Sequence, residues 1–243
     1  MERVLVVPPL VLPTIGPLVR EAEKRGMRVV EAGAEVDAGA VHYYGGPKIG
    51  ERVAARYGVG LLEPVDRWLP ELPEEYRRRR IEAMTLENAW ALEEKSFVKP
   101  PSDKGFDARV YADGDDLRRT TRDLRPDTPV LVSDVVEFAE EFRLFVLDGE
   151  VRAGCRYARW GHLDPQPSVP DQMRGLVKEL AETLPSAVVV DVGLLEGNVA
   201  VVEANMAWFA QPYMADVGRV LEVVLRAAGP RAWVKARDLA FLR

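Results

Sequence analysis

The chain has 243 residues, and its 47% hydrophobic and 30% charged residues are typical of a soluble globular protein that can bury a core. Its formal net charge of −6 argues against general nucleic-acid binding, because contact with a phosphate backbone needs a basic face. No apolar run approaches the roughly 20 residues that span a bilayer. Met1 leads into an expected strand without a signal peptide, so we expect a cytoplasmic protein with no membrane partner.

Cysteine and histidine are too scarce for two common kinds of site. Cys155 is the only cysteine, which excludes a disulfide within the chain, and its small neighbours favour a packed strand residue over a nucleophile. His42 and His162 are the only histidines, so a zinc site built from histidine and cysteine is not expected.

Residues 1–92 predict a small α/β domain followed by a helical connector. The short apolar run 4–7, ended by two prolines, is typical of a buried strand in a parallel sheet. From 64 to 92 the pattern is helical and charged, and the arginine run 77–80 is expected on a solvated helix face. The expected strands are 4–7, 28–30 and 40–44, and the expected helices follow Thr14 and Pro47 and end at Gly26 and Gly58.

Strand patterns dominate residues 93–243, which we assign to a second domain. The segment 101–106 is expected to be a turn-rich loop, and the segment 160–170, rich in Gly and Pro, a second loop. The expected strands are 96–100, 107–111, 129–132, 142–147, 151–157, 188–193 and 199–205, and the expected helices are 113–124, 169–184 and 214–228.

The last two strands predict a hairpin with the loop 196–198. A three-residue loop centred on Gly197 places Asp191 opposite Glu203. Asn205 is two residues beyond Glu203 and therefore shares its face. Two neighbouring carboxylates and an amide are hard oxygen ligands that suit Mg²⁺, which usually accompanies phosphate. We expect Asp191, Glu203 and Asn205 to hold Mg²⁺; the alternative is that one of the carboxylates lies on a solvated face.

Two lysines lie at the turn-rich loop. Lys99 ends an expected strand and Lys104 follows within the loop, so both could neutralise a polyphosphate from the side opposite the hairpin. Exposed surface lysines are the alternative. The position of Lys99, at the end of an apolar strand and before a proline, weakens that alternative.

Several motifs follow one another along residues 93–243: Phe97-Val98-Lys99-Pro100, Val130 to Asp134, Glu141 to Val146, Asp191, and Glu203-Ala204-Asn205. In their order and spacing they resemble the ATP-grasp fold. The pattern Glu-Phe-Arg, together with Lys104, is similar to the small ATP-grasp branch named for one arginine and two lysines. The resemblance implies an α/β (α+β) protein, with an ATP-grasp fold over about 93–228 preceded by a small α/β N-terminal domain.

The resemblance also implies ATP and Mg²⁺ as cofactors. Lys99 would reach the α- and β-phosphates, and Lys104, on the loop that closes over the nucleotide, would help to hold them. Asp134 would open the hinge whose backbone meets adenine. Val135 and Glu137 would be the hinge contacts, and Glu141 would accept from the ribose hydroxyls.

The catalytic groups implied by the resemblance are Arg143 and Lys104, with Mg²⁺ on Asp191, Glu203 and Asn205 bridging the β- and γ-phosphates. Arg143 would meet the transferred phosphate or an acyl-phosphate; the alternative is a salt bridge to Glu141 or Glu137. The chain departs from many relatives in two respects. The loop 101–106 has only Gly105, and Val189 and Val190 stand where relatives carry an arginine, a charge that Arg143 or Arg156 would have to supply.

The function that follows from the resemblance is an ATP-dependent carboxylate–amine ligase that works through an acyl-phosphate. Its partners would be small-molecule or peptide carboxylates and amines, and a homodimer is left open. Phosphoryl transfer to a hydroxyl, as in a kinase, and a non-catalytic nucleotide-binding module are the alternatives. Tyr43, Tyr44, Lys48 and the loop 160–162 could line the acceptor site, although core aromatics and a surface loop are the favoured interpretation.

Overall fold

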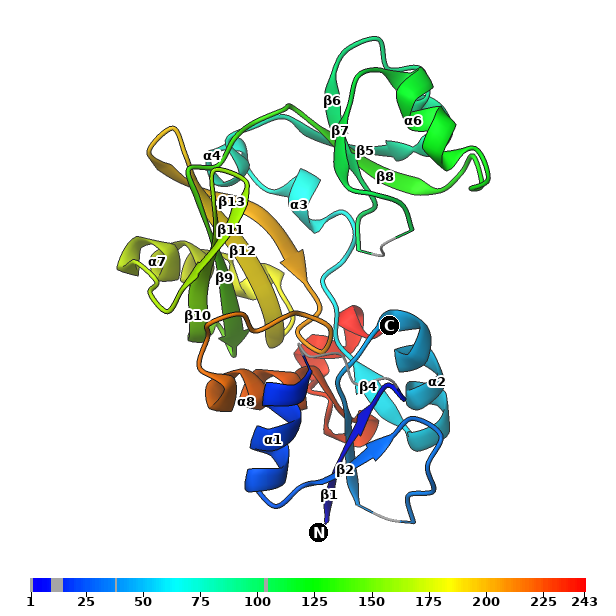
Figure 1. Cartoon of the computed structure of the whole chain (residues 1–243), viewed down its shortest axis with the longest axis vertical. Helices are drawn as coiled ribbons and strands as arrows, with labels where there is room; N and C mark the ends of the chain where they lie inside the picture. The colour runs from blue at the N-terminus through cyan, green and yellow to red at the C-terminus, as the bar shows by residue number, and fades with distance from the viewer. Residues whose placement is uncertain (1, 10–14, 38, 103–104) are drawn as a thin grey trace.

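The structure is a computed structural model that describes residues 2–9, 15–37, 39–102 and 105–243, and within these residues the strands form four sheets (Figure 1). Three of the sheets are each formed by consecutive strands, and the fourth pairs residues 59–61 with residues 228–230. None of the helices in the described part of the chain is both long and apolar enough to cross a lipid bilayer.

The N-terminal domain is a three-stranded parallel sheet with helices, as expected. Its central strand is fully buried at Val4, Leu5 and Val6, which explains the continuous apolar run. Thr14 lies outside the described residues, and Ile15 occupies the cap position of α1. The sheet order is β2 (Arg28–Glu31), β1 (Arg3–Val7), β3 (Ala40–Tyr43), and the helices are α1 (Gly16–Lys24) and α2 (Pro47–Tyr57).

The C-terminal end of the chain returns to this domain (Figure 1). Strand β14 (Ala228–Pro230) pairs with β4 (Val59–Leu61), and Leu242 forms an isolated bridge with Leu62. Two 3₁₀ turns, Arg231–Trp233 and Ala236–Phe241, connect these contacts.

The four-stranded sheet forms a lobe of its own, with α6 (Gly114–Thr121) packed on it (Figure 1). The helical prediction for 64–92 is wrong at Ile81–Thr85, because these residues form a strand, β5, that pairs with β8 and buries Ile81. The domain boundary near residue 93 remains a prediction. The sheet order is β5, β8 (Pro129–Ser133), β6 (Ser96–Lys99), β7 (Arg109–Tyr111), and the short helices of this region are α3 (Trp68–Glu71), α4 (Glu74–Arg77) and α5 (Leu86–Ala89).

The five-stranded antiparallel sheet carries a helix on each face. Even-numbered residues of β12 (Ala187–Leu195), such as Val188 and Val190, share a core with α7, whereas Val189 shares a core with α8. The segment 160–170 was expected to be a loop, but it contains a short edge strand, β11. The order is β11 (His162–Gln166), β10 (Glu150–Arg159), β9 (Glu140–Leu147), β12 (Ala187–Leu195), β13 (Asn198–Asn205), and the helices are α7 (Asp171–Leu180) and α8 (Val217–Ala227).

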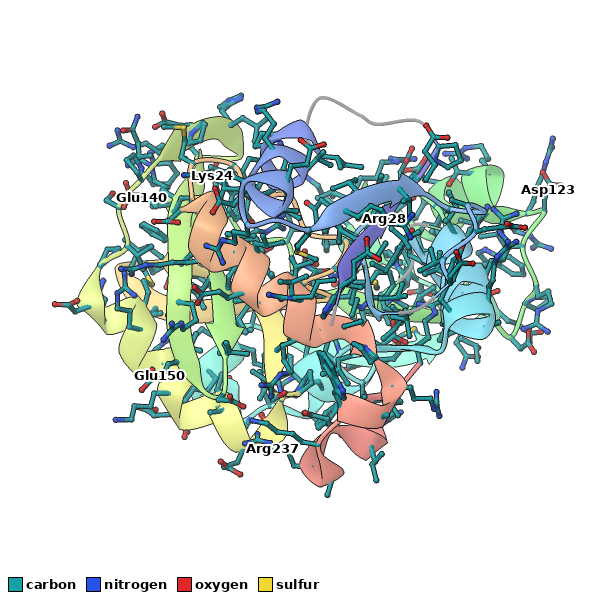
Figure 2. The ribbon with its side chains drawn as sticks, turned by 90° about the horizontal axis from the view of Figure 1, so that it is seen from below. Lys24, Arg28, Asp123, Glu140, Glu150 and Arg237 are labelled. Atoms are coloured by element: carbon teal, nitrogen blue, oxygen red, sulfur yellow. The ribbon has the colours of Figure 1, made fainter. Side chains whose placement is uncertain are left out.

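The lobe formed by the four-stranded sheet and the five-stranded sheet are well separated at the outer edges of the molecule. Figure 2 shows Asp123, which follows α6, at one edge of the molecule and Glu150, at the start of β10, near the opposite edge. The two larger sheets meet where Lys99 of β6 contacts Glu203 of β13, and Ile81 and Leu131 of the four-stranded sheet share a hydrophobic core with the five-stranded sheet.

Candidate functional site

A row of charged residues crosses the five-stranded sheet. Arg143 of β9 is the register partner of Asp191 of β12, and Asp191 is the partner of Glu203 of β13. These side chains stand on the same face as Phe145 and Val189, because strand residues two apart point the same way. The expected pairing of Asp191 with Glu203 is thus confirmed.

The pairing is correct although the expected loop is wrong. The turn has two residues, Glu196 and Gly197, both with positive φ (50° and 79°), and Leu195 faces Asn198. That register alone would place Asp191 opposite residue 202. A one-residue bulge at Val202 shifts the register, so that Glu203 faces Asp191 instead.

Arg143 and Asp191 form a buried bidentate ion pair. Arg143 donates from Nε to Oδ1 of Asp191 at 2.9 Å and from Nη2 to Oδ2 at 2.7 Å, and Asp191 is 0% exposed. Burial raises the pKa of Asp191, and the adjacent guanidinium opposes this shift. The guanidinium also lies 5.4 Å from the ring centroid of Tyr157 and 5.3 Å from that of Tyr213. Arg143 is therefore held rigidly within the sheet.

This pair replaces the salt bridge that was the alternative for Arg143, and its contact with phosphate remains a prediction. The partner of Arg143 is Asp191, and neither Glu141 nor Glu137, so the expected alternative salt bridge is wrong. Arg156 instead pairs with Glu140 and Asp164, each at 2.6 Å. Arg143 and Arg156 were the two arginines expected to supply the positive charge that Val189 and Val190 lack. Of these two, Arg143 lies beside Asp191.

The second carboxylate is paired across the two sheets. Lys99, at the end of β6, donates to Oε2 of Glu203, and Asn205 donates to its Oε1 at 2.6 Å. Burial alone would raise the pKa of Glu203, but the Lys99 ammonium and the amide of Asn205 lower this pKa to about 2. Glu203 is therefore ionised at neutral pH.

Arg79 holds the bulge that aligns the row, and the sequence did not predict it. Its guanidinium donates to the carbonyls of Val201 (2.8 Å) and Val202 (3.0 Å) and stacks over the ring of Phe138. Burial lowers the pKa of Arg79 to about 10, which still leaves it charged at neutral pH. The predicted solvated helix face is wrong for this residue. Nothing in an arginine run indicates which member turns inward.

A cavity of about 580 Å³, here termed the inter-sheet cavity, lies between the four- and five-stranded sheets. This volume is within the usual range for small-molecule sites. The backbone after β8 forms one wall, where Asp134 is fixed because Arg80 N donates to its Oδ2 at 2.8 Å. The cavity is lined by the described residues expected to contact nucleotide, Lys99, Asp134, Val135, Glu137 and Glu141, and by the expected metal ligand Glu203. Lys104 lies outside the described residues.

Tyr157 is a second residue of this cavity that sequence reasoning missed. Its hydroxyl donates to Oε2 of Glu141 at 2.7 Å, and its ring stacks on Tyr213. Burial raises the pKa of Glu141 and also the pKa of Tyr157, which keeps the tyrosine protonated. The signal was available: Tyr157 lies on the strand that pairs with β9, near Glu141 in the hairpin register.

A second cavity, also about 580 Å³, lies between the N-terminal domain and the ends of the sheet. Arg143, Glu203 and Asn205 line one part of it, and Glu203 lines both cavities. Of the acceptor-site candidates, Tyr44 borders this cavity, and Gly161 borders the inter-sheet cavity. Tyr43 is a buried core aromatic.

The oxygen-bearing residues of the row have the donor set that Mg²⁺ takes. Asp191, Glu203 and Asn205 lie at adjacent register positions, and Arg143 leaves a further lone pair on each oxygen of Asp191. Only two of the three are carboxylates, and within the described ranges no group of three or more His, Cys, Asp or Glu side chains could hold a metal. Asp191 is fully buried and borders neither cavity, whereas Glu203 and Asn205 line the second one, so the magnesium site on these three residues remains a prediction.

The fold of the chain is similar to that of several solved proteins. The chain resembles the structure of a RimK domain ATP-grasp protein from Sphaerobacter thermophilus (15% identity, 92% of this chain and 99% of that chain, TM-score 0.55). It also resembles D-alanine–D-alanine ligase from Bacillus anthracis complexed with ATP (12%, 93% and 96%, 0.58) and the macrocyclase MdnC bound with its precursor peptide from Microcystis aeruginosa (12%, 93% and 99%, 0.51). These likenesses show the fold.

A search of curated proteins gave no match. The model of an ATP-grasp domain, family 2 of the clade named for one arginine and two lysines, matches residues 76–223. The match covers more than half of the chain and includes Arg79, Lys99 and the whole charged row. The chain therefore belongs to this clade of ATP-grasp proteins.

Proposed function

We propose that the chain is an ATP-dependent carboxylate–amine ligase that forms an amide or peptide bond through an acyl-phosphate. The observation that carries the proposal is the position of Glu203, which lines both cavities at the end of the row Arg143–Asp191–Glu203. A nucleotide in the inter-sheet cavity and a carboxylate in the second cavity would meet at this row.

The inter-sheet cavity has the groups needed to hold ATP. Lys99 would contact the phosphates, the backbone at Asp134, Val135 and Glu137 would follow the adenine edge, and Glu141 would accept from the ribose hydroxyls. Tyr157 occupies one oxygen of Glu141 and so orients the other toward the cavity. Lys104 is proposed from the sequence to hold the phosphates from the loop.

Asp191, Glu203 and Asn205 would hold Mg²⁺, which would neutralise charge on the β- and γ-phosphates when bound. Arg143 adds a fixed positive charge beside them. Preorganised charges of this kind stabilise phosphoryl transfer without a covalent protein nucleophile.

The reaction has two displacements. A carboxylate oxygen of the acceptor attacks the γ-phosphorus, and ADP leaves. An amine nitrogen then attacks the acyl carbon and loses a proton, and phosphate leaves. The names of the similar structures, a D-alanine–D-alanine ligase and a macrocyclase, support a bond-forming ligase.

Hydroxylamine provides a test that needs no knowledge of the amine, because it converts an acyl-phosphate into a hydroxamate. The protein would be incubated with Mg²⁺, ATP, hydroxylamine and a panel of carboxylates, and products analysed by mass. We expect one ADP for each hydroxamate, and ¹⁸O transfer from labelled carboxylate to phosphate.

Variants separate the site from the rest of the protein. Asp191→Asn and Glu203→Gln should each abolish ADP release, whereas Glu150→Gln, at the exposed start of β10 (Figure 2), should not. Full activity in both site variants would contradict the mechanism. An acceptor that only gains phosphate would indicate a kinase, and ATP binding without ADP release across the panel would indicate a non-catalytic module.

A further inference from the structure

Tyr157 is the extra residue of a β-bulge in the wall of the inter-sheet cavity. Arg156 of β10 faces Phe142 of β9, and the next register pair joins Ala158 to Glu141, so Tyr157 is the residue inserted between them. Bulges re-aim a side chain and are frequent beside active sites. Tyr157 and Glu141 both line the cavity. The bulge therefore belongs to the part of the sheet that a bound nucleotide would meet.

The hydroxyl of Tyr157 fixes the carboxylate of Glu141. It donates to Oε2 of Glu141 at 2.7 Å, which restricts rotation of the carboxylate. Burial raises the pKa of Tyr157 well above its ordinary value, so the hydroxyl keeps its proton and remains a donor. A ligand hydroxyl that donates to Glu141 would meet an acceptor whose orientation is already set. Binding to such an acceptor loses less conformational entropy than binding to a free side chain.

The ring of Tyr157 is itself held by two contacts. It stacks on Tyr213, with ring centroids 5.4 Å apart and planes 12° from parallel, and the guanidinium of Arg143 lies 5.4 Å from its centroid. Arg143 is fixed in turn by its bidentate pair with Asp191. The hydroxyl is thus attached to a rigid part of the five-stranded sheet. Tyr157→Phe would keep the ring in these contacts and remove the hydrogen bond to Glu141.

The chain contains a second bond of the same kind in another place. Tyr76 donates from its hydroxyl to Oε2 of Glu179 at 3.2 Å, and neither residue lines the inter-sheet cavity or the second cavity. Tyr76→Phe therefore provides a matched control for the loss of a tyrosine–glutamate hydrogen bond as such.

We infer that Tyr157 is a positioning residue that makes the inter-sheet cavity selective for nucleotides with intact ribose hydroxyls, because it holds Glu141 in the orientation that accepts from them. The inference rests on the proposed function, since it concerns the nucleotide site of that function. It goes further by assigning the selectivity for the sugar to a residue that acts through Glu141.

Nucleotide binding without turnover tests the inference. The full chain is titrated in a calorimeter with ADP and with 2′,3′-dideoxyADP, each with Mg²⁺, and the ratio of the two affinities measures selectivity for the sugar. The original protein should bind ADP at least about tenfold more tightly. Tyr157→Phe should lower this ratio about fivefold, because one hydrogen bond contributes about that factor. The loss should appear in the binding of ADP, whereas the binding of 2′,3′-dideoxyADP should be almost unchanged.

Two further comparisons separate positioning from a purely structural role. Tyr76→Phe should leave the ratio of affinities unchanged. Glu141→Ala should remove most of the ratio, and Tyr157→Phe added to Glu141→Ala should cause no further loss, since the tyrosine acts through the glutamate. Both affinities are measured on the same variant, so their ratio remains informative for a variant that is partly unfolded.

The outcomes separate this inference from the proposed function. A ratio that falls in Tyr157→Phe but not in Tyr76→Phe, and falls no further beside Glu141→Ala, supports the inference even if no hydroxamate forms and the ligase proposal fails. An unchanged ratio in Tyr157→Phe overturns the inference, and hydroxamate formed by the same preparation leaves the ligase proposal intact. Equal weakening of both nucleotides in Tyr157→Phe, or no binding of either by the original protein, also overturns the inference.

Discussion

The two sheets that border the inter-sheet cavity present charge in different ways. The five-stranded sheet pairs its own charges: Arg143 and Asp191 come from adjacent strands, and their side chains are 12% and 0% exposed. The four-stranded sheet contributes Lys99, whose partner Glu203 belongs to the other sheet and is 28% exposed. The first pair stays within one rigid element, while the second connects two.

This difference indicates that the two ion pairs have different roles. A bidentate pair inside one sheet is fixed by the strand register and cannot open without distorting the strands. A pair between two sheets can open when the sheets move apart or when a phosphate competes for the lysine. We expect the first pair to determine stability and the second to respond to ligands.

The largest effect on stability should come from Asp191→Asn. This change leaves the guanidinium of Arg143 buried without a counter-charge, which costs about 3–5 kcal/mol in similar cases. Urea denaturation would measure the free energy of unfolding. Its control is the double variant Arg143→Met with Asp191→Leu, which removes both charges and should recover much of the loss. A double variant as unstable as the single one would contradict the assignment of the loss to an unpaired charge.

The second-largest effect on stability should come from a change at Arg79, which holds the bulge at Val202. Arg79→Lys keeps the positive charge but cannot donate to the carbonyls of Val201 and Val202 as a fork, so we expect a loss of about 2 kcal/mol. ADP release should fall as well, because Glu203 would no longer be held opposite Asp191. Arg80→Lys, a neighbouring and exposed arginine, is the matched control. Equal effects in the two variants would show that Arg79 does not hold the bulge.

Patterns that repeat along the chain predicted most of the fold. The parallel N-terminal sheet and the hairpins follow from apolar runs and from Asp148-Gly149 and Gly197 at their turns. The strand Ile81–Thr85 was missed because its neighbours are charged and helical, and its partner β8 is distant in sequence. A strand at such a position is stabilised by tertiary pairing, which local propensity does not encode.

For the candidate site, the sequence predicted which residues take part better than it predicted the backbone geometry that aligns them. Asp191, Glu203 and Lys99 were chosen because their chemistry suits phosphate and Mg²⁺, and Arg143 was chosen by the family resemblance; the structure brings all four together. The expected loop at Gly197 was too long by one residue, an error that the bulge at Val202 offset. Neither the bulge nor its arginine can be inferred from sequence alone, because both depend on backbone carbonyls left free by a shifted register.

A smaller effect on stability should follow from Glu203→Gln. Glu203 is 28% exposed, whereas Asp191 is 0% exposed, so the loss should be about 1 kcal/mol, well below that of Asp191→Asn. A double-mutant cycle with Lys99→Met would isolate the coupling between the two sheets. Added ATP and Mg²⁺ should stabilise the original protein more than Glu203→Gln in a thermal-shift assay. A loss as large as that of Asp191→Asn would remove the contrast between the pairs.

The smallest effect should appear in the pH dependence. The pKa of Glu203 is about 2 in the folded protein and 4.5 for an ordinary glutamate, so its pair with Lys99 stabilises the fold fully above pH 4.5. This contribution is lost as the pH falls toward 2, because the unfolded chain then binds a proton that the folded chain does not. Unfolding midpoints measured from about pH 5.5 down to about pH 3 should therefore converge for the original protein and Glu203→Gln.

Asp191 should behave in the opposite way, and this provides the sharpest control. Burial raises the pKa of Asp191, so the folded protein binds a proton at this carboxyl at least as readily as the unfolded chain does. Protonation of Asp191 at low pH therefore does not lower the stability of the folded protein, in contrast to protonation of Glu203. Asp191→Asn should therefore retain the loss of stability between pH 4.5 and 2 that Glu203→Gln abolishes. If the two variants flattened the pH profile equally, the two carboxylates would titrate as one coupled unit, and the contrast between a pair within one sheet and a pair between two sheets would be wrong.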